Sequence, residues 1–210
     1  MKLLLATRNR HKLAEIRAIL RIPGLETIAA DEVPGLPEVE EDAPTFEGNA
    51  CKKARTLAQA GGLWTLADDS GLEVDALGGA PGVRSARYAG VQGDTPANNA
   101  KLLRRMEGLA DRRARFRCVL ALAAPDGRAW TVEGTCAGRL LESPRGGRGF
   151  GYDPLFVPDG CEQTFAEMEP EAKNRISHRA AALRQAAAAW RDRLAPDVTG
   201  RRPEGSADPA

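Results

Sequence analysis

The chain has 210 residues, 28% of them charged, with a formal net charge of +1. This length allows one domain with a substantial core, and the balanced charge excludes the global basic field that attracts nucleic acid. An anionic ligand must therefore be held by local charge. The four cysteines form no CxxC pair and the apolar runs are too short to span a bilayer. We therefore expect a reduced, cytoplasmic protein that binds neither nucleic acid nor membrane.

The N-terminal segment, residues 2–20, predicts a short strand, a polar loop and a helix from Lys12 onward, whose apolar residues recur at helical spacing. Backbone N–H groups at a helix N-terminus are unpaired and attract anions, so this loop is a candidate phosphate site with Lys12 as a point charge. The alternative is an ordinary strand-to-helix turn that Thr7 or Asn9 caps. The P-loop pattern GxxxxGK[ST] does not occur in the chain.

Residues 22–44 are rich in proline, glycine and acid, which predicts a short strand and an exposed acidic loop. The next stretch, TFEGNACKKARTLAQAG, predicts a helix with one apolar stripe. Asn49 and Lys53 are four residues apart on it and face the same way. Lys53 is either a surface lysine or, if Glu41 and Asp69 meet beside this helix, a cation of a shared site.

An apolar run at residues 62–67 leads into two adjacent acids, and we expect a buried strand that ends there. A sharp turn at Ser70-Gly71 is expected to follow. Consecutive side chains of a strand point to opposite faces, so either Asp68 or Asp69 is presented at the strand end. Carboxylate oxygens suit Mg²⁺, which takes one or two carboxylates beside water and phosphates. The alternative is a plain turn, since Asp, Ser and Gly are common turn residues.

The middle of the chain contains a long loop with Arg84, Arg87 and Tyr88, followed by a helix and a hairpin. Residues 76–93 form a long glycine-rich stretch, and loops of that length are usually functional or disordered. A helix is predicted over 96–106. Residues 115–136 then predict a β-hairpin reversed at Asp126-Gly127, to which we assign no chemistry.

Two later stretches are more informative. A glycine-flanked loop, GFGYDPLF, places an aromatic residue beside an acid, which predicts either a cradle for a flat heterocycle or a turn with a core phenylalanine. Ser177 predicts the cap of an alanine-rich helix, with Lys173, His178 and Arg179 around its N-terminus. Cations there oppose the helix dipole, so we expect a bound anion, unless an arginine-rich chain places them by chance. Residues 196–210 are expected to form a disordered tail.

Five segments, in order, resemble the inosine triphosphate pyrophosphatase family: ATRNRHK, TFEGNACKKA, LADDSGLEVDALGGAPGVRSARYAG, GFGYDPLF and KNRISHR. The resemblance runs from Lys2 to about Leu194. It implies an α/β fold in which a long mixed β-sheet is flanked by helices, with two lobes around a central cleft, over one domain at residues 1–195. It also implies a homodimer that hydrolyses ITP, dITP and XTP to the monophosphate and pyrophosphate.

The resemblance further implies roles for single residues. Glu41 and Asp69 match the Mg²⁺ positions, although a one-residue slip would exchange Glu41 with Glu40. Asp69 also matches the proton acceptor, with assistance from Asp68 or Glu41 left open. The implied substrate contacts are Thr7, Arg8, Asn9, Arg10, His11, Lys12, Lys53, Ser70, Phe150, Gly151, Tyr152, Asp153, Lys173, His178 and Arg179.

Two other functions stay open from the sequence. One is a nucleotide pyrophosphatase that acts on modified pyrimidine or methylated nucleotides, and the other is a non-catalytic regulator that binds nucleotides. The joint presence of Glu41, Lys53 and Asp69 favours an enzyme over the regulator.

Overall fold

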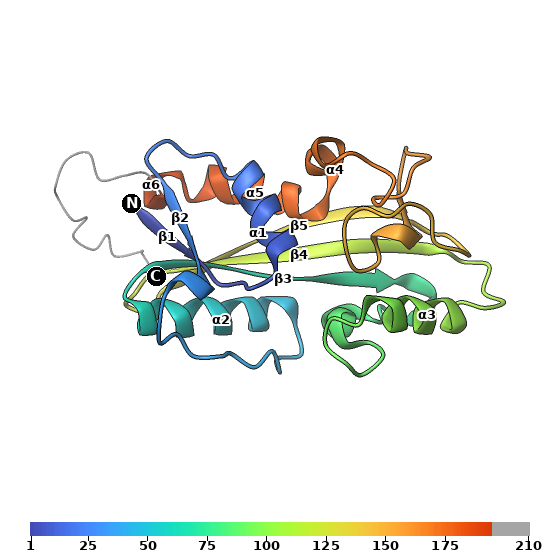
Figure 1. Cartoon of the computed structure of the whole chain (residues 1–210), viewed down its shortest axis with the longest axis horizontal. Helices are drawn as coiled ribbons and strands as arrows, with labels where there is room; N and C mark the ends of the chain where they lie inside the picture. Colours follow the sequence, from blue (N-terminus) through green and yellow to red (C-terminus); the bar gives the residue numbers. More distant parts are fainter. Residues whose placement is uncertain (195–210) are drawn as a thin grey trace, which may run out of the picture.

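The computed structural model describes residues 1–194, so the predicted tail at 196–210 lies outside the described residues. Six strands form one mixed sheet in the order β2-β1-β3-β4-β5-β6 (Figure 1). β1 is parallel to β2 and β3, whereas β3 to β6 pair antiparallel. The strands are β1 (Lys2–Leu5), β2 (Glu26–Ala29), β3 (Trp64–Val74), β4 (Arg113–Ala123), β5 (Ala129–Leu140) and β6 (Phe156–Pro158).

Helices cover both faces of this sheet, which confirms the predicted α/β class (Figure 1). One face carries α1 (Arg10–Ile19), α4 (Pro170–Ile176), α5 (His178–Ala189) and α6 (Arg191–Leu194). The opposite face carries α2 (Phe46–Gly61). α3 (Thr95–Arg105) lies toward the other end of the long strands, where Leu102 and Met106 share an apolar cluster with Leu72 of β3. The connections between these strands and helices contain short 3-10 helices: η1 (Ala30–Glu32), η2 (Asp75–Leu77), η3 (Gly82–Arg87) and η4 (Asp153–Leu155).

The buried side chains of the described residues gather in three apolar clusters. The first lies between the sheet and α1 with α5, for example Ile16, Leu120 and Leu183. The second lies between the sheet and α2, where alanines let the helix approach closely. The third contains Phe116 and Phe156, under α3 at the far end of the long strands. The first two clusters therefore pack one end of the long strands, on both faces of the sheet, and the third cluster packs the other end.

The predicted strand end at Asp68-Asp69 and the turn at Ser70-Gly71 are wrong. β3 continues to Val74 and pairs with β4 along its length, with Ser70 opposite Cys118. The ladder satisfies the backbone groups that a turn would otherwise satisfy locally, so tertiary pairing overrides the turn propensity of Asp, Ser and Gly. Gly71 is needed for packing instead, because a Cβ there would lie 2.4 Å from Ser85 Oγ.

Other predicted elements are close to the observed ones. The hairpin is confirmed as β4 and β5, and the helix over 96–106 as α3. α1 begins at Arg10 rather than Lys12, and the stretch over 76–93 contains η2 and η3. No helix within residues 1–194 combines the length and the apolar character needed to cross a membrane.

The unequal lengths of β1 and β3 position the site. β1 ends at Leu5, whose partner in register is Leu66, and the next backbone bond runs from Ala6 N to Leu66 O. β3 then continues alone on this side, so Asp68, Asp69 and Ser70 lie along a strand edge that β1 no longer covers. Ligands of open α/β sheets commonly bind where strands end in this way.

Candidate active site

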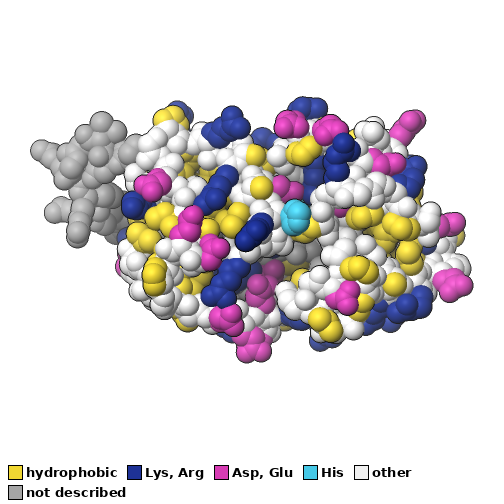
Figure 2. Space-filling model, in the orientation of Figure 1, with side chains coloured by type: hydrophobic (Ala, Val, Ile, Leu, Met, Phe, Trp, Pro, Cys, Tyr) yellow, Lys and Arg dark blue, Asp and Glu magenta, His cyan; other side chains and the backbone are white. Residues whose placement is uncertain are grey.

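A cavity of about 750 Å³ opens beside this edge, within the size range of small-molecule sites. Figure 2 shows a hollow near the middle of the molecule with basic and acidic side chains around it. Of the predicted site residues, all but Arg10 line the cavity: Thr7, Arg8, Asn9, His11, Lys12, Glu41, Lys53, Asp69, Ser70, Phe150, Gly151, Tyr152, Asp153, Lys173, His178 and Arg179.

Arg10 is exposed and does not line the cavity. It is the first residue of α1, two positions before Lys12. Residues two apart on an α-helix point about 200° apart, so when Lys12 faces inward Arg10 faces solvent. The sequence prediction carried over the whole loop and did not separate the helix faces.

The loop before α1 is capped by its own side chains. Asn9 is the N-cap, and its Oδ1 accepts hydrogen bonds from the backbone N–H groups of His11, at 2.9 Å, and Lys12, at 3.3 Å. Thr7 Oγ1 accepts from Asn9 N at 3.2 Å. Asn9 therefore caps the helix, the side chain of Lys12 provides the positive charge of this segment, and phosphate binding at this loop stays a prediction.

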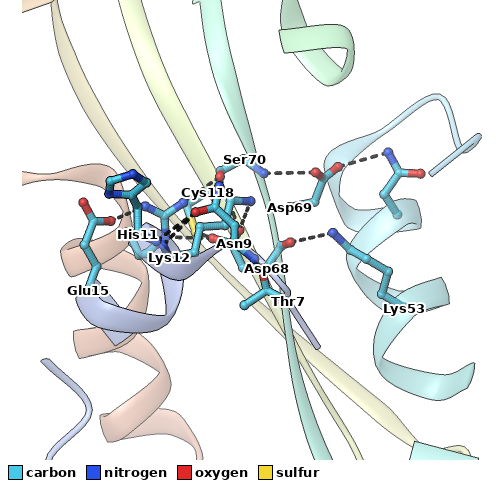
Figure 3. A network of polar contacts seen from close by, with 12 residues as sticks. Thr7, Asn9, His11, Lys12, Glu15, Lys53, Asp68, Asp69, Ser70 and Cys118 are labelled. Carbon is cyan, nitrogen blue, oxygen red and sulfur yellow. Dashed lines mark hydrogen bonds and ion pairs between the residues drawn. The ribbon is translucent and has the colours of Figure 1, made fainter. Parts of the chain in front are cut away.

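Asp68 is the centre of an ion-pair network on the α1 and α5 face of the sheet (Figure 3). Its side chain is fully buried and accepts from Lys12 Nζ, from Arg179 Nε at 2.9 Å and from Cys118 Sγ at 3.1 Å. Burial alone would raise the pKa of Asp68, but Arg179 and Lys12 hold it well below its usual value. Asp68 is therefore a fixed negative charge and a poor proton acceptor.

The cations near the start of α5 are neutralised by carboxylates within the described chain. Arg179 also pairs with Glu15 and donates to Ser70 Oγ at 2.8 Å. Lys173 pairs with Glu15 at 2.9 Å and with Asp153 at 2.7 Å. Acids distant in sequence therefore supply part of the charge that these cations need, and a bound anion at the start of α5 stays a prediction.

Sequence reasoning missed Glu15. It stands three residues after Lys12 on α1, and Figure 3 shows both side chains on the same side of β3. That spacing places two side chains on one helix face and is the signal that could have identified it.

His178 differs from the cation that the sequence suggested. The side chain is buried and stacks on Phe116, with ring centroids 4.7 Å apart. Burial, followed by the nearby Arg179 and Lys173, holds the pKa of His178 well below its usual value. His178 is therefore neutral near pH 7, and its Nδ1 has no hydrogen-bond partner among the described residues.

Asp69 points to the opposite face, toward α2. Asn49 Nδ2 donates to its Oδ2 at 3.0 Å, and Ser70 N donates to its Oδ1 at 3.1 Å. Lys53 Nζ donates to Glu41 Oε1 at 3.0 Å and to the backbone carbonyl of Asp68 at 2.7 Å. The predicted common face of Asn49 and Lys53 is confirmed. Lys53 is not a surface lysine, because it is buried beside Glu41.

Glu40, the residue before Glu41, lies outside the cavity. Glu40 is exposed and does not line the cavity, whereas Glu41 is half-buried and does. Of the two acids, Glu41 is therefore the one that lies at the cavity, and its role as a metal ligand stays a prediction.

The two acids beside α2 differ in proton affinity. Burial, together with the nearby charge of Glu41, raises the pKa of Asp69 to about 6. Burial would also raise the pKa of Glu41, but the Lys53 ammonium lowers it below its usual value. Asp69 is thus the carboxylate whose proton affinity suits general-base catalysis near neutral pH.

The donor set fits a magnesium ion better than a closed metal centre. Residues 1–194 contain no group of three or more His, Cys, Asp or Glu side chains arranged to hold a metal. The negative charge of Glu41 raises the proton affinity of Asp69, and a divalent cation held by the two carboxylates would relieve that repulsion. Mg²⁺ commonly takes one or two carboxylates and leaves its remaining positions to water and phosphates.

The other end of the cavity is built around Phe150. His11 stacks on its ring at 5.3 Å between centroids, and Lys173 Nζ lies 5.0 Å from the ring centroid. Asp153 Oδ2 accepts from Phe150 N at 2.9 Å and fixes this loop. Phe150 is only half-buried, so it is not the core phenylalanine of the alternative interpretation.

Tyr152 and Gly151 anchor the same loop to the rest of the molecule. Tyr152 is buried, and its hydroxyl donates to Ser85 O at 2.9 Å. Gly151 O accepts from Asn99 Nδ2 at 3.1 Å. The cavity therefore joins an aromatic end, with Phe150 beside Lys173 and Arg179, to an acidic end, with Glu41 and Asp69 beside Lys53.

Comparisons with known proteins agree with this geometry. A family model described as the Ham1 family matches residues 3–189. A dITP/XTP pyrophosphatase of Desulforamulus reducens is 54% identical over 188 residues, 89% of this chain and 94% of that protein. One of Geobacter sulfurreducens is 52% identical over 184 residues, 87% of this chain and 92% of that protein.

Solved structures of related proteins are similar to this chain in fold and in sequence. A HAM1 protein from Coxiella burnetii has a TM-score of 0.84 and 40% identity, covering 91% of this chain and 99% of that one. A nucleoside-triphosphatase, dITP/XTP pyrophosphatase, from Mycobacterium abscessus has a TM-score of 0.73 and 45% identity, covering 88% of this chain and 98% of that one.

Proposed function

This chain belongs to the Ham1 family, and from that premise we propose that it hydrolyses non-canonical purine nucleoside triphosphates such as ITP, dITP and XTP. The products are the nucleoside monophosphate and pyrophosphate. One observation carries the proposal: a single cavity joins the aromatic, ion-paired end at Phe150 and Arg179 to the acidic end at Glu41 and Asp69. A purine fits the first end, and the phosphates fit the second.

Asp69 is proposed as the proton acceptor. In the metal-free protein its pKa is about 6, and a bound Mg²⁺ would lower that value, so the proposal rests on the place of Asp69 at the acidic end of the cavity. Asn49 and the backbone N–H of Ser70 fix the orientation of its carboxylate. Asp68 is the weaker candidate for this role, because its charge is committed to Lys12 and Arg179.

The remaining residues position and neutralise the phosphates. Phosphoryl-group cleavage depends mainly on alignment and on stabilising charge at the oxygens. Lys12 and Lys53 supply fixed positive charge from α1 and α2. Mg²⁺, when bound, would be held by Glu41 and Asp69 and would orient the phosphates and neutralise part of their charge.

Base selection is proposed to depend on donors at the Phe150 end. Hypoxanthine and xanthine carry a 6-keto acceptor where adenine carries an amino donor. Arg179 and Lys173 are buried donors held by Glu15, Asp68 and Asp153. A buried donor that faces the amino group of adenine would stay unpaired, and such penalties discriminate strongly between substrates.

A panel of nucleoside triphosphates, assayed for released pyrophosphate with and without Mg²⁺, tests the proposal. We expect Mg²⁺-dependent turnover that is fastest with ITP, dITP and XTP and slow with ATP, CTP and UTP. Preference for a modified pyrimidine would contradict the substrate class. Binding of ITP without turnover would identify a regulator instead. Assembly as a homodimer and a cytoplasmic location belong to the same proposal, and light scattering of the purified protein tests the first.

A further inference from the structure

Arg87 lines the cavity but has no role in the reaction described so far. It is the last residue of η3, within the glycine-rich stretch that the sequence left without chemistry. Its side chain is half-buried, and Arg87 Nη2 donates to the backbone carbonyl of Glu41 at 2.7 Å. A cation from η3 therefore lies against the residue proposed to hold the metal.

The charge of Arg87 is not neutralised by the described part of the chain. The other lysines and arginines of the cavity lining each pair with at least one carboxylate: Arg8 with Glu38, Lys12 with Asp68, Lys53 with Glu41, Lys173 with Asp153 and Arg179 with Asp68. Within residues 1–194 no carboxylate lies at ion-pair distance from Arg87, whose bond to Glu41 is made to a carbonyl. An anion that binds at Arg87 therefore displaces no acid.

The segment that carries Arg87 is held in place from both sides. Asn98 Nδ2 donates to Ala86 O at 3.2 Å, and Asn98 Oδ1 accepts from Ala89 N at 2.7 Å. Ser85 Oγ accepts from Leu72 N at 2.9 Å, which ties η3 to β3. Because the backbone around Arg87 is fixed, little ordering is needed when a ligand binds.

The chemistry of the side chain indicates the ligand. A guanidinium presents N–H donors in a planar fork that matches phosphate oxygens. Glu41 and Lys53 place Arg87 at the acidic end of the cavity, where the proposed function puts the phosphates. A triphosphate has more negative charge to balance than the already paired Lys12 and Lys53 can supply.

We propose that Arg87 binds the β- and γ-phosphates, the part of the substrate that leaves as pyrophosphate. This inference rests on the proposed function. In that reaction the oxygen of water bonds to the α-phosphorus, and a proton of the water passes to Asp69. The bond from the α-phosphorus to the bridging oxygen breaks, and its electron pair leaves with pyrophosphate, where Arg87 stabilises the added negative charge.

Binding measurements test this without any need for turnover. Calorimetric titrations with inorganic tripolyphosphate and with IMP, at constant Mg²⁺, are compared for the parent, Arg87→Ala and Arg87→Gln. Arg84→Ala is the matched control, since Arg84 belongs to the same η3 but is exposed and does not line this cavity. We expect Arg87→Ala and Arg87→Gln to bind tripolyphosphate about tenfold or more weakly, and IMP within about twofold of the parent. Arg84→Ala should leave both affinities unchanged.

Unchanged tripolyphosphate affinity in Arg87→Gln overturns the inference, as does a parent that binds no tripolyphosphate. An equal loss of IMP and tripolyphosphate also overturns it, because it would show that Arg87 only supports the fold around Glu41. Thermal unfolding of each variant verifies that it is folded, and Arg87→Gln repeats the test with a longer neutral side chain. If tripolyphosphate binding depends on Arg87 but no triphosphate is hydrolysed, the proposed function fails, and of this inference only the assignment of Arg87 as a polyphosphate-binding residue stands.

Discussion

Asp68 and Asp69 are neighbours on β3, yet their carboxylates face opposite sides of the sheet and their pKa values are shifted in opposite directions. Because side chains alternate along a strand, Asp68 faces α1 and α5, where it pairs with Lys12 and Arg179. Asp69 faces α2 and accepts a hydrogen bond from the neutral amide of Asn49. The same residue type is thus a fixed counter-charge at one position and, in the proposed reaction, the proton acceptor at the next.

Replacement of Asp69 by Asn should remove the turnover and keep the fold. The asparagine retains an oxygen that accepts from Asn49 Nδ2, but it cannot take a proton from water. Loss of a general base typically costs about 10²–10⁴-fold in rate. Pyrophosphate release from dITP measures the effect, and circular dichroism verifies the fold. Activity within a few-fold of the parent would show that the proton acceptor lies elsewhere.

The same variant should change how stability depends on pH when a chelator keeps the protein free of metal. The folded pKa of Asp69, about 6, exceeds its ordinary value of 3.8, so the protonated acid favours the folded state. That contribution is complete below pH 4 and is lost as the pH rises through 6. Asp69→Asn should therefore gain stability relative to the parent between pH 4 and pH 8, by no more than about 3 kcal/mol. Urea unfolding at both pH values measures it, and parallel pH profiles for the two proteins would contradict the expectation.

Asp68→Asn should behave differently, as a loss of stability. Arg179 is 1% exposed and would keep a buried charge with one fewer counter-charge. Breaking one side of a buried ion pair costs about 3 kcal/mol or more. Urea unfolding at pH 7.5 measures the loss, with Asp126→Asn as a control, because that acid sits exposed in the turn between β4 and β5. A midpoint equal to that of the parent would show that the network around Asp68 contributes nothing.

Local patterns in the sequence predicted much of this fold. Apolar spacing predicted α2 and its common face for Asn49 and Lys53, and the PDG turn predicted the β4–β5 hairpin. These features depend on residues close together in the chain, so one segment contains the whole signal. The motifs likewise predicted which segments meet at the cavity, apart from Arg10.

Features that depend on distant segments were not predicted. Turn residues at Ser70-Gly71 suggested a strand end, but pairing with β4 is decided by residues some fifty positions away. Glu15 lies in a helix that looked ordinary by itself, and only the fold brings it to Arg179. His178 was grouped with cations, whereas its burial against Phe116 keeps it neutral. Charge balance inside a site is a property of the assembled structure.

Lys53→Ala should lower kcat/KM much more than Lys52→Ala does. Lys53 is buried, holds Glu41 at 3.0 Å and lines the cavity, whereas its neighbour Lys52 is exposed and pairs with Asp42 outside it. Loss of a hydrogen bond to a charged group at the site corresponds to a decrease of about tenfold to a hundredfold. Steady-state kinetics with dITP measures both variants. Equal kcat/KM values would reduce Lys53 to a supporting residue of α2.

Glu15→Gln should destabilise the protein in a way that depends on pH. Burial would raise the pKa of Glu15, but Arg179 and Lys173 lower it below its ordinary value of 4.5. A depressed folded pKa stabilises the protein above the unfolded value, and this contribution is lost as the pH falls through the folded one. The variant should therefore be less stable than the parent by about 2 kcal/mol at pH 7.5, with a smaller difference at pH 4. Glu171→Gln, on the exposed side of α4, is the control and should match the parent at both values. Urea unfolding gives the comparison, and a difference between Glu15→Gln and the parent that grows toward acid would show that Glu15 is not held as an anion.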